Sequence, residues 1–216
     1  GRADVGIKTI ADIKGKRLIP GDRGSGTEID CKNVLEGLGL SYKDFSSTDW
    51  LSFSGASQRL KDKQADVTFT TAGWPTAAIT ELAMTSDITL IPLDDKTIAA
   101  LLKKFPFYAK IVIPKGTYRG MDKDVPTITT MAQWAVDANV PEELVYKLTH
   151  ALWEKGKFVL RKKGDVADDA PSGAEMMAQI HNTAKQVQLK TALEGVGAVP
   201  LHPGAAKYYR EKGMIK

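Results

Sequence analysis

The chain has 216 residues, of which 43% are hydrophobic and 26% charged, and its formal net charge is +4. This composition is typical of a globular chain that buries a core, and the small, scattered excess of positive charge argues against nucleic acid as a partner. No apolar run reaches the roughly 18–20 residues of a membrane-spanning helix, and the single cysteine excludes an internal disulfide and a multi-cysteine metal site.

The first part of the chain alternates short strands with amphipathic helices. Gly39 is suited to end the first helix, Ser54 to cap the second, and Pro75 to open the third. The predicted strands are Arg17–Pro20, Asp49–Phe53, Ala65–Thr71 and Asp87–Leu93, and the predicted helices are Glu28–Gly39, Ser54–Gln64 and Pro75–Ser86. This alternation predicts an α/β fold with a mainly parallel sheet that helices cover on both faces.

The second part of the chain is richer in predicted helix. Acidic residues follow Pro141 in the first turn of the longest helix, where they suit the helix dipole. The predicted helices are Asp95–Phe105, Val140–Lys163, Ala174–Gly195 and His202–Gly213, the predicted strands are Tyr108–Pro114 and Thr127–Asp137, and Asp165–Glu175 is expected to be a connector.

The sequence offers little for catalysis. A nucleophile needs a base beside it, usually histidine, yet His150 and His181 fall inside predicted helices and His202 opens the last one. Ser25 lacks the flanking glycines of a nucleophile elbow. The acidic and histidine residues show no metal-ligand spacing. We therefore predict no catalytic residue, no metal and no cofactor.

The stretch GDRGSGTEID, residues 21–30, is a glycine-rich turn that leads into a predicted helix. Glycines allow a tight turn and a close approach of a ligand to the backbone. Successive N–H groups at such a helix start favour a carboxylate or a phosphate, and Ser25 and Thr27 add hydroxyl groups. The alternative is that Thr27 merely caps the helix and the glycines merely turn the chain.

A second turn, TFTTAGWP, follows the predicted strand that ends at Thr71. In open parallel α/β sheets, ligands bind beyond the carboxyl ends of the strands. Both turns lie at such ends, so they are expected to face one cleft, which favours binding over simple capping.

Several long stretches together resemble one family. DIKGKRLIPGDRGSGTE, LSFSGASQRLKDKQADVTFTTAGWPTAAITELA, KFPFYAKIVIPKGTY and LHPGAAKYYREKG occur in order over nearly the whole chain. They resemble the TAXI family, the extracytoplasmic solute receptors of tripartite ATP-independent periplasmic (TRAP) transporters. The resemblance implies a periplasmic-binding-protein fold of type II, with two lobes that hold a small organic anion, a dicarboxylate or an acidic amino acid such as glutamate.

The resemblance also implies site residues and partners. It assigns ligand binding to the anion turn, to the second turn and to the aromatic residues of the PFY and GTY motifs. The residues are Ser25, Gly26 and Thr27, then Thr71, Ala72 and Gly73, and then Phe107, Tyr108 and Tyr118. Arg23 is a departure from the usual pattern, and it either pairs with a second acid group or is solvent-exposed. The implied partner is a TRAP membrane permease, and the implied location is periplasmic or extracytoplasmic, although no leader is visible in GRADVG at the front of the chain.

One large departure concerns the front of the chain. Members of the family carry roughly a further hundred residues, including a glycine-rich turn, before the stretch that begins at Asp12. The resemblance therefore implies that residues 7–92 are a complete second lobe and that residues 93–216 are the C-terminal part of an incomplete first lobe. Such a part would expose an apolar sheet edge or face, which a complementing N-terminal segment or self-association would cover.

The main hypothesis is solute capture for uptake, without catalysis. Two alternatives stay open: a small α/β enzyme that uses the glycine-rich turn as an anion site, and a receptor fragment that binds nothing. The absence of a placed nucleophile and base disfavours the enzyme.

Overall fold

The computed structural model describes residues 1–156, 169–197 and 199–216. The chain divides into two compact units, residues 1–131 and residues 132–216, and each is described by itself. No helix in these ranges combines the length and the apolar character needed to cross a membrane. The predicted division into lobes, residues 7–92 and 93–216, concerns a complete receptor with both lobes present, and it stays a prediction.

The first unit is built on a small parallel sheet. Strand β1, Arg17–Ile19, lies between β2, Ser47–Thr48, and β3, Val67–Thr68, and pairs in parallel with both. Side chains alternate across a strand, and β1 accordingly buries Leu18 in one apolar cluster and Ile19 in the other. The mixed α/β architecture with a parallel sheet agrees with the sequence prediction, although the strands are shorter than predicted.

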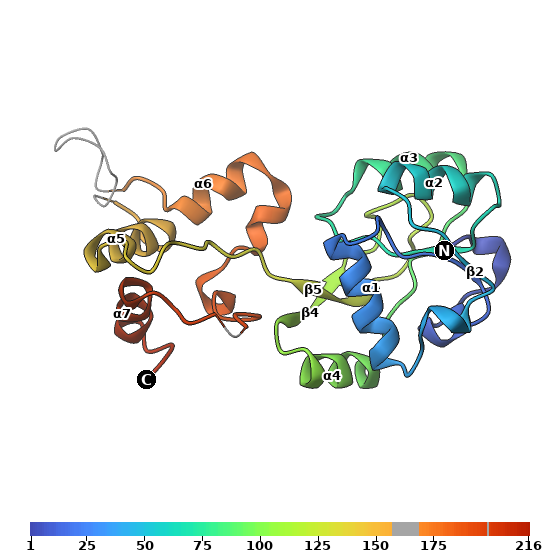
Figure 1. Ribbon diagram of the computed structural model, residues 1–216. Coiled ribbons are helices and arrows are strands. Elements are labelled where there is room, and N and C mark those ends of the chain that lie inside the picture. Colours follow the sequence, from blue (N-terminus) through green and yellow to red (C-terminus); the bar gives the residue numbers. More distant parts are fainter. Residues whose placement is uncertain (157–168, 198) are drawn as a thin grey trace. The chain divides into compact units, whose positions relative to one another are not determined.

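Helices cover both faces of this sheet (Figure 1). Helix α1 packs beside α4 and helix α2 beside α3. Side-chain oxygens of Ser25, Ser52 and Asp94 cap α1, α2 and α4 by accepting a hydrogen bond from the backbone of the first turn. The bounds are Gly26–Gly37 for α1, Phe53–Lys61 for α2, Ala77–Thr85 for α3 and Asp95–Lys104 for α4.

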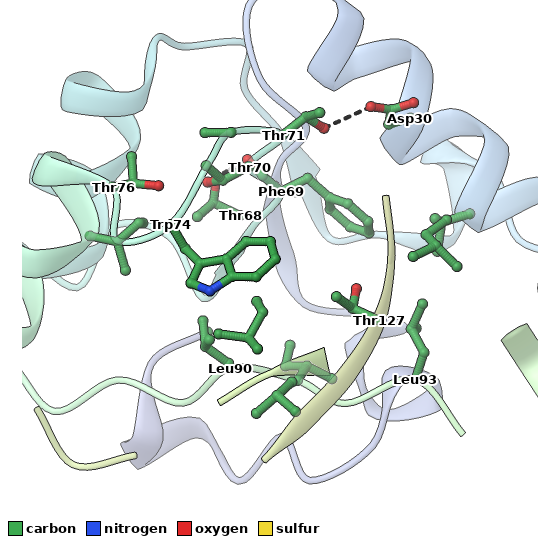
Figure 2. Close-up of a pocket in the computed structure, with 18 of the residues that line it drawn as sticks. Asp30, Thr68, Phe69, Thr70, Thr71, Trp74, Thr76, Leu90, Leu93 and Thr127 are labelled. Carbon is green, nitrogen blue, oxygen red and sulfur yellow. Dashed lines mark hydrogen bonds between the residues drawn. The ribbon is translucent and has the colours of Figure 1, made fainter. Parts of the chain in front are cut away.

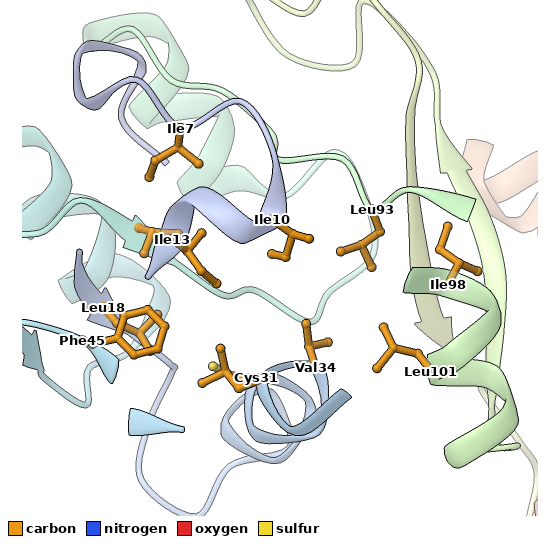
Figure 3. Packing of buried hydrophobic residues seen from close by; sticks show 12 residues of the cluster. Ile7, Ile10, Ile13, Leu18, Cys31, Val34, Phe45, Leu93, Ile98 and Leu101 are labelled. Carbon is orange, nitrogen blue, oxygen red and sulfur yellow. The ribbon is translucent and has the colours of Figure 1, made fainter. Parts of the chain in front are cut away.

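The larger apolar cluster of this unit fills the space between β1, α1 and α4 (Figure 3). Leu18, Cys31 and Leu101 are almost completely buried there. The two helices approach closely at Gly37, where an added Cβ would lie 2.3 Å from Leu101 Cδ2. Short 3-10 helices at Ala3–Val5, Ile10–Ile13 and Tyr42–Asp44 complete the connections.

Several element predictions for this unit were wrong in detail. The predicted strand Asp49–Phe53 is a connection, because Ser52, not Ser54, caps a helix that already begins at Phe53. Pro75 does not open α3, whose N-cap is Thr76. The predicted strand 87–93 makes only one isolated bridge, from Ile88 to Arg2. The prediction for Gly39 is confirmed, because it follows α1 with φ +69.

A second, two-stranded sheet also belongs to the first unit. Strand β4, Tyr108–Ile113, pairs antiparallel with β5, Val125–Thr130. The predicted strand 127–137 therefore ends at Thr130, and the residues that follow have no regular structure up to the turn before α5.

The second unit is mainly helical. Helices α5, Glu142–Trp153, and α7, Pro203–Glu211, pack closely, and an added Cβ at Gly204 would lie 2.2 Å from Glu142 O. Helix α6, Gly173–Ile180, is followed by 3-10 helices at 182–186 and 189–191. The predicted helix 174–195 is thus interrupted at His181, while the prediction for 202–213 is confirmed by α7. The predicted helix 140–163 and the predicted connector 165–175 fall partly on residues 157–168, which lie outside the described ranges.

The second unit exposes several large apolar side chains, while the apolar sheet edge or face expected for residues 93–216 stays a prediction. Trp134 is 70% exposed, Ile180 84% and Val199 71%.

Candidate functional site

The glycine turn before α1 owes its shape to two glycines. Gly21 and Gly24 have φ values of +108° and +77°, in the region that favours glycine. An added Cβ at Gly21 would lie 2.8 Å from Thr27 Cγ2, so the turn wraps tightly over the Thr27 side chain. Gly26 has no positive φ, and nothing lies within 4 Å of its Cβ position. The shape of the turn therefore depends on Gly21 and Gly24 and not on Gly26.

The turn presents free peptide donors at the start of α1. Ser25 is the N-cap: its Oγ accepts from Glu28 N at 3.1 Å, while its own N–H donates to Asp22 O at 3.0 Å. The next two N–H groups, of Gly26 and Thr27, have no partner within an α-helix, and none is found in the described part of the chain. Ser25, and not Thr27, caps the helix. The arrangement leaves two N–H groups at a helix N-terminus, which favours an anion.

A charged group of each sign flanks these donors. Glu28 folds back across the turn, where its carboxylate accepts from Gly24 N and, at 2.6 Å, from Trp50 Nε1. The Gly24 N–H holds the pKa of Glu28 below its usual value. The Arg23 guanidinium stacks on the Trp50 ring, 3.9 Å from its centroid. Arg23 is exposed but is held beside the turn, so it is available to a second acidic group.

The second predicted turn reaches α1 through one carboxylate. Thr71 Oγ1 donates to Asp30 Oδ2 at 2.7 Å, which ties the segment after β3 to the second turn of α1. Thr76 Oγ1 donates to Gly73 O at 2.8 Å and closes the loop before α3. Ala72 and Gly73 are exposed.

Of the predicted aromatic residues, Tyr108, at the start of β4, binds the same carboxylate. Tyr108 OH donates to Asp30 Oδ1 at 2.6 Å and accepts from Asn33 Nδ2 at 3.0 Å. Burial, together with the bond to Asp30, raises the pKa of Tyr108. Phe107 packs on the Tyr108 ring with a centroid distance of 4.6 Å. Asp30 therefore connects three parts of the unit: helix α1, strand β4 and the segment that follows β3.

A pocket of about 240 Å³ opens within the first unit, among β3, the segment 88–93, β4 and β5 (Figure 2). Its walls are mostly apolar with several threonine hydroxyls, and its described lining includes no lysine, arginine or histidine. Tyr118 also lines it, and its hydroxyl accepts from Thr76 N at 2.9 Å. The predicted site residues Thr71, Ala72, Tyr108 and Tyr118 line this pocket, whereas Arg23, Ser25, Gly26, Thr27, Gly73 and Phe107 do not.

Eight of the ten predicted residues thus form two groups, one on the glycine turn and one in the pocket, and Gly73 and Phe107 belong to neither. Asp30 connects them along α1 and was not predicted. A signal for it existed, because Asp30 follows Gly26 by four residues and so lies on the same helical face. Trp50 was also missed, since its contacts with Arg23 and Glu28 depend on the order of β1 and β2 and leave no local pattern.

The chemistry of the first unit does not suggest a nucleophile. It contains no histidine to activate Ser25. Cys31 is fully buried, and burial raises the pKa of its thiol. No group of acidic, histidine or cysteine residues in the described ranges is arranged to hold a metal ion.

The family model described as the NMT1-like family matches residues 2–213, which is nearly the whole chain.

Proposed function

The chain belongs to the NMT1-like family, a family of periplasmic-binding type, and on that basis we propose that it is the extracytoplasmic solute receptor of a TRAP transporter. Membership of this family suggests a solute-binding receptor, and the family's members are binding proteins and not typical enzymes. In our proposal the solute is a small carboxylate, a dicarboxylate or an acidic amino acid. The loaded receptor delivers it to the membrane permease.

The observation that carries the proposal is the start of α1. The N–H groups of Gly26 and Thr27 point out of the helix without a partner in the described ranges, and the Ser25 hydroxyl still has its own hydrogen to donate. A carboxylate placed there gains charge-assisted hydrogen bonds of roughly 1.5–3 kcal/mol each. Arg23, held on Trp50, takes the second carboxylate of a diacid.

The rest of the receptor follows from the sequence resemblance. We propose that residues 7–92 belong to one lobe and residues 93–216 to the other, that the solute lies between the lobes, and that Thr71 to Gly73, Phe107, Tyr108 and Tyr118 stand on or near the rim of the cleft. Asp30 supports this grouping, because it ties Thr71 and Tyr108 to α1.

Calorimetric titration tests the proposal. The chain is titrated with succinate, glutamate and 2-oxoglutarate, and with butyrate as a matched monocarboxylate. The variants are Ser25→Ala and Arg23→Gln, and Ser52→Ala is the control, because Ser52 caps α2 as Ser25 caps α1. Each serine variant loses a helix cap that contributes a similar stabilisation. A difference in solute affinity between the two variants therefore reports the contact of Ser25 with the solute.

We expect Ser25→Ala to weaken diacid binding by about tenfold or more and Ser52→Ala to leave it unchanged. Arg23→Gln should remove the preference for succinate over butyrate. Equal affinities in Ser25→Ala and Ser52→Ala, or binding of none of the four acids, would refute the proposed site.

A further inference from the structure

Two side chains of opposite charge contact the same indole beside the glycine turn. The Arg23 guanidinium lies over the Trp50 ring, 3.9 Å from the ring centroid, and Trp50 Nε1 donates to the Glu28 carboxylate at 2.6 Å. A guanidinium matches a carboxylate in geometry and usually pairs with one that is within reach. In the described part of the chain, however, no ion pair joins Arg23 to Glu28.

The Glu28 carboxylate is held by a different donor at each oxygen. Gly24 N donates to Oε2, and Trp50 Nε1 donates to Oε1. The hydrogen bond from Gly24 and, to a smaller extent, that from Trp50 lower the pKa of Glu28, so the side chain is a carboxylate at neutral pH. The Trp50 N–H therefore occupies the oxygen that is left over by the turn itself.

Trp50 is fixed in place from two sides. Asp49 N donates to Leu18 O at 3.1 Å, which continues the parallel pairing of β1 and β2 up to the residue before the tryptophan. The half-buried Tyr42 ring meets the indole edge to face, with a centroid distance of 5.6 Å and an interplanar angle of 85°. The indole is thus a rigid support that belongs to the sheet, while the groups it holds belong to the glycine turn and α1.

We propose, as a step that rests on the function proposed above, that Trp50 is a positioning residue that sets the preference of the site for diacids. Its ring holds Arg23 beside the free N–H groups of the helix start, and its N–H keeps Glu28 occupied. The guanidinium thereby keeps its donors for the second carboxylate of the solute. Without the Trp50 N–H, Glu28 Oε1 lacks a donor and Arg23 supplies one. That ion pair neutralises the charge that distinguishes a diacid from a monoacid.

A double-mutant cycle tests this role. Trp50→Phe keeps an aromatic face for Arg23 and removes the N–H. The same substitution is also made in a Glu28→Gln chain, which has no carboxylate to capture the guanidinium. Trp153→Phe is the matched control, because it removes an indole N–H that donates to Tyr209 OH at 3.3 Å in the second unit. For each chain, calorimetry gives the ratio of the affinities for succinate and butyrate.

We expect Trp50→Phe to lower this ratio by about two- to fivefold, the range of an exposed ion pair that competes with the solute. In the Glu28→Gln chain the same substitution should leave the ratio as it is, and so should Trp153→Phe in the wild-type chain. An equal fall in both Glu28 backgrounds would show that Trp50 acts only through the packing of its ring. That result would overturn the proposal, and so would the absence of any fall.

A second measurement needs no solute and separates this proposal from the function on which it rests. Nuclear Overhauser contacts between the Arg23 Nε proton and the Glu28 Cγ protons are recorded in the wild-type chain and in Trp50→Phe. We expect these contacts to strengthen in the variant, because the two side chains pair, and unchanged contacts would overturn the proposal. Stronger contacts in a chain that binds neither acid would overturn the role in solute preference together with the proposed function, and would leave Trp50 only as the side chain that separates the two charges.

Discussion

Replacing Gly21 with alanine should destabilise the turn that presents the free N–H groups of α1. Gly21 has φ +108°, and a Cβ there would lie 2.8 Å and 2.9 Å from Thr27 Cγ2 and Cβ. The backbone conformation alone costs a non-glycine residue about 1–3 kcal/mol, and the contact adds to this cost because Thr27 is buried. Gly26→Ala is the matched control: its φ is not positive and its Cβ position is open. At a helix start, alanine there is neutral or stabilises by up to about 1 kcal/mol.

The single cysteine provides the assay. Cys31 lies on α1 and is 0% exposed, so a thiol reagent reaches it only when this part of the unit opens. Under conditions in which closing is faster than labelling, the labelling rate follows the free energy of opening, with a tenfold change for each 1.4 kcal/mol or so. We expect labelling to be about 5- to 150-fold faster in Gly21→Ala and unchanged or slower in Gly26→Ala. Equal rates in the two variants would refute the account of the turn.

Three further predictions concern the packing around this site and the second unit. The hydrogen bonds from Arg17 lower the pKa of Asp66, so the stability that they contribute is present above the unfolded pKa of 3.8 and is lost as pH falls through the folded pKa. Asp66→Asn should therefore lower the free energy of unfolding at neutral pH and make that free energy decrease less steeply below about pH 4, as measured by urea unfolding across pH. Tyr108→Phe should cost roughly 1.5–3 kcal/mol of unfolding free energy, because the Tyr108 hydroxyl donates to the Asp30 carboxylate. In a double-mutant cycle the same substitution should cost less when Asp30 is already alanine, and an equal or larger cost in that background would deny the coupling. Gly204→Ala should destabilise the second unit by more than about 1 kcal/mol, seen in thermal unfolding, because its Cβ would strike the backbone of α5; an unchanged midpoint would contradict the close approach of α5 and α7.

The core of the α/β unit could be predicted from sequence because its signals are local. The apolar strand around Leu18 runs into a glycine turn, and the helix after it has a regular apolar face. Where two local signals compete, the sequence is ambiguous, because Ser25 and Thr27 can both cap a helix. The cap is the last residue with an extended backbone before the helix, and in this structure that residue is Ser25, with ψ 161°.

The parts that could not be predicted depend on contacts between distant residues. Asp30 meets Thr71 and Tyr108, which are 41 and 78 residues away in the sequence. The apolar run 87–93 predicts a strand, yet its pairing depends on Gly1 and Arg2 at the other end of the unit. Such partners are set by the order of strands in the fold and leave no periodic pattern.

The most direct test of the central claim, a carboxylate held at the start of α1, is a titration of the isotopically labelled chain with succinate, followed by amide chemical shifts. The account predicts that the largest shifts occur at the N–H groups of Gly26 and Thr27, with the Arg23 side chain following at the same concentrations. The backbone of Ser52 to Gly55, at the capped start of α2, serves as the internal reference and should not respond. Shifts confined to the pocket residues, or equal shifts at both helix starts, would contradict the claim.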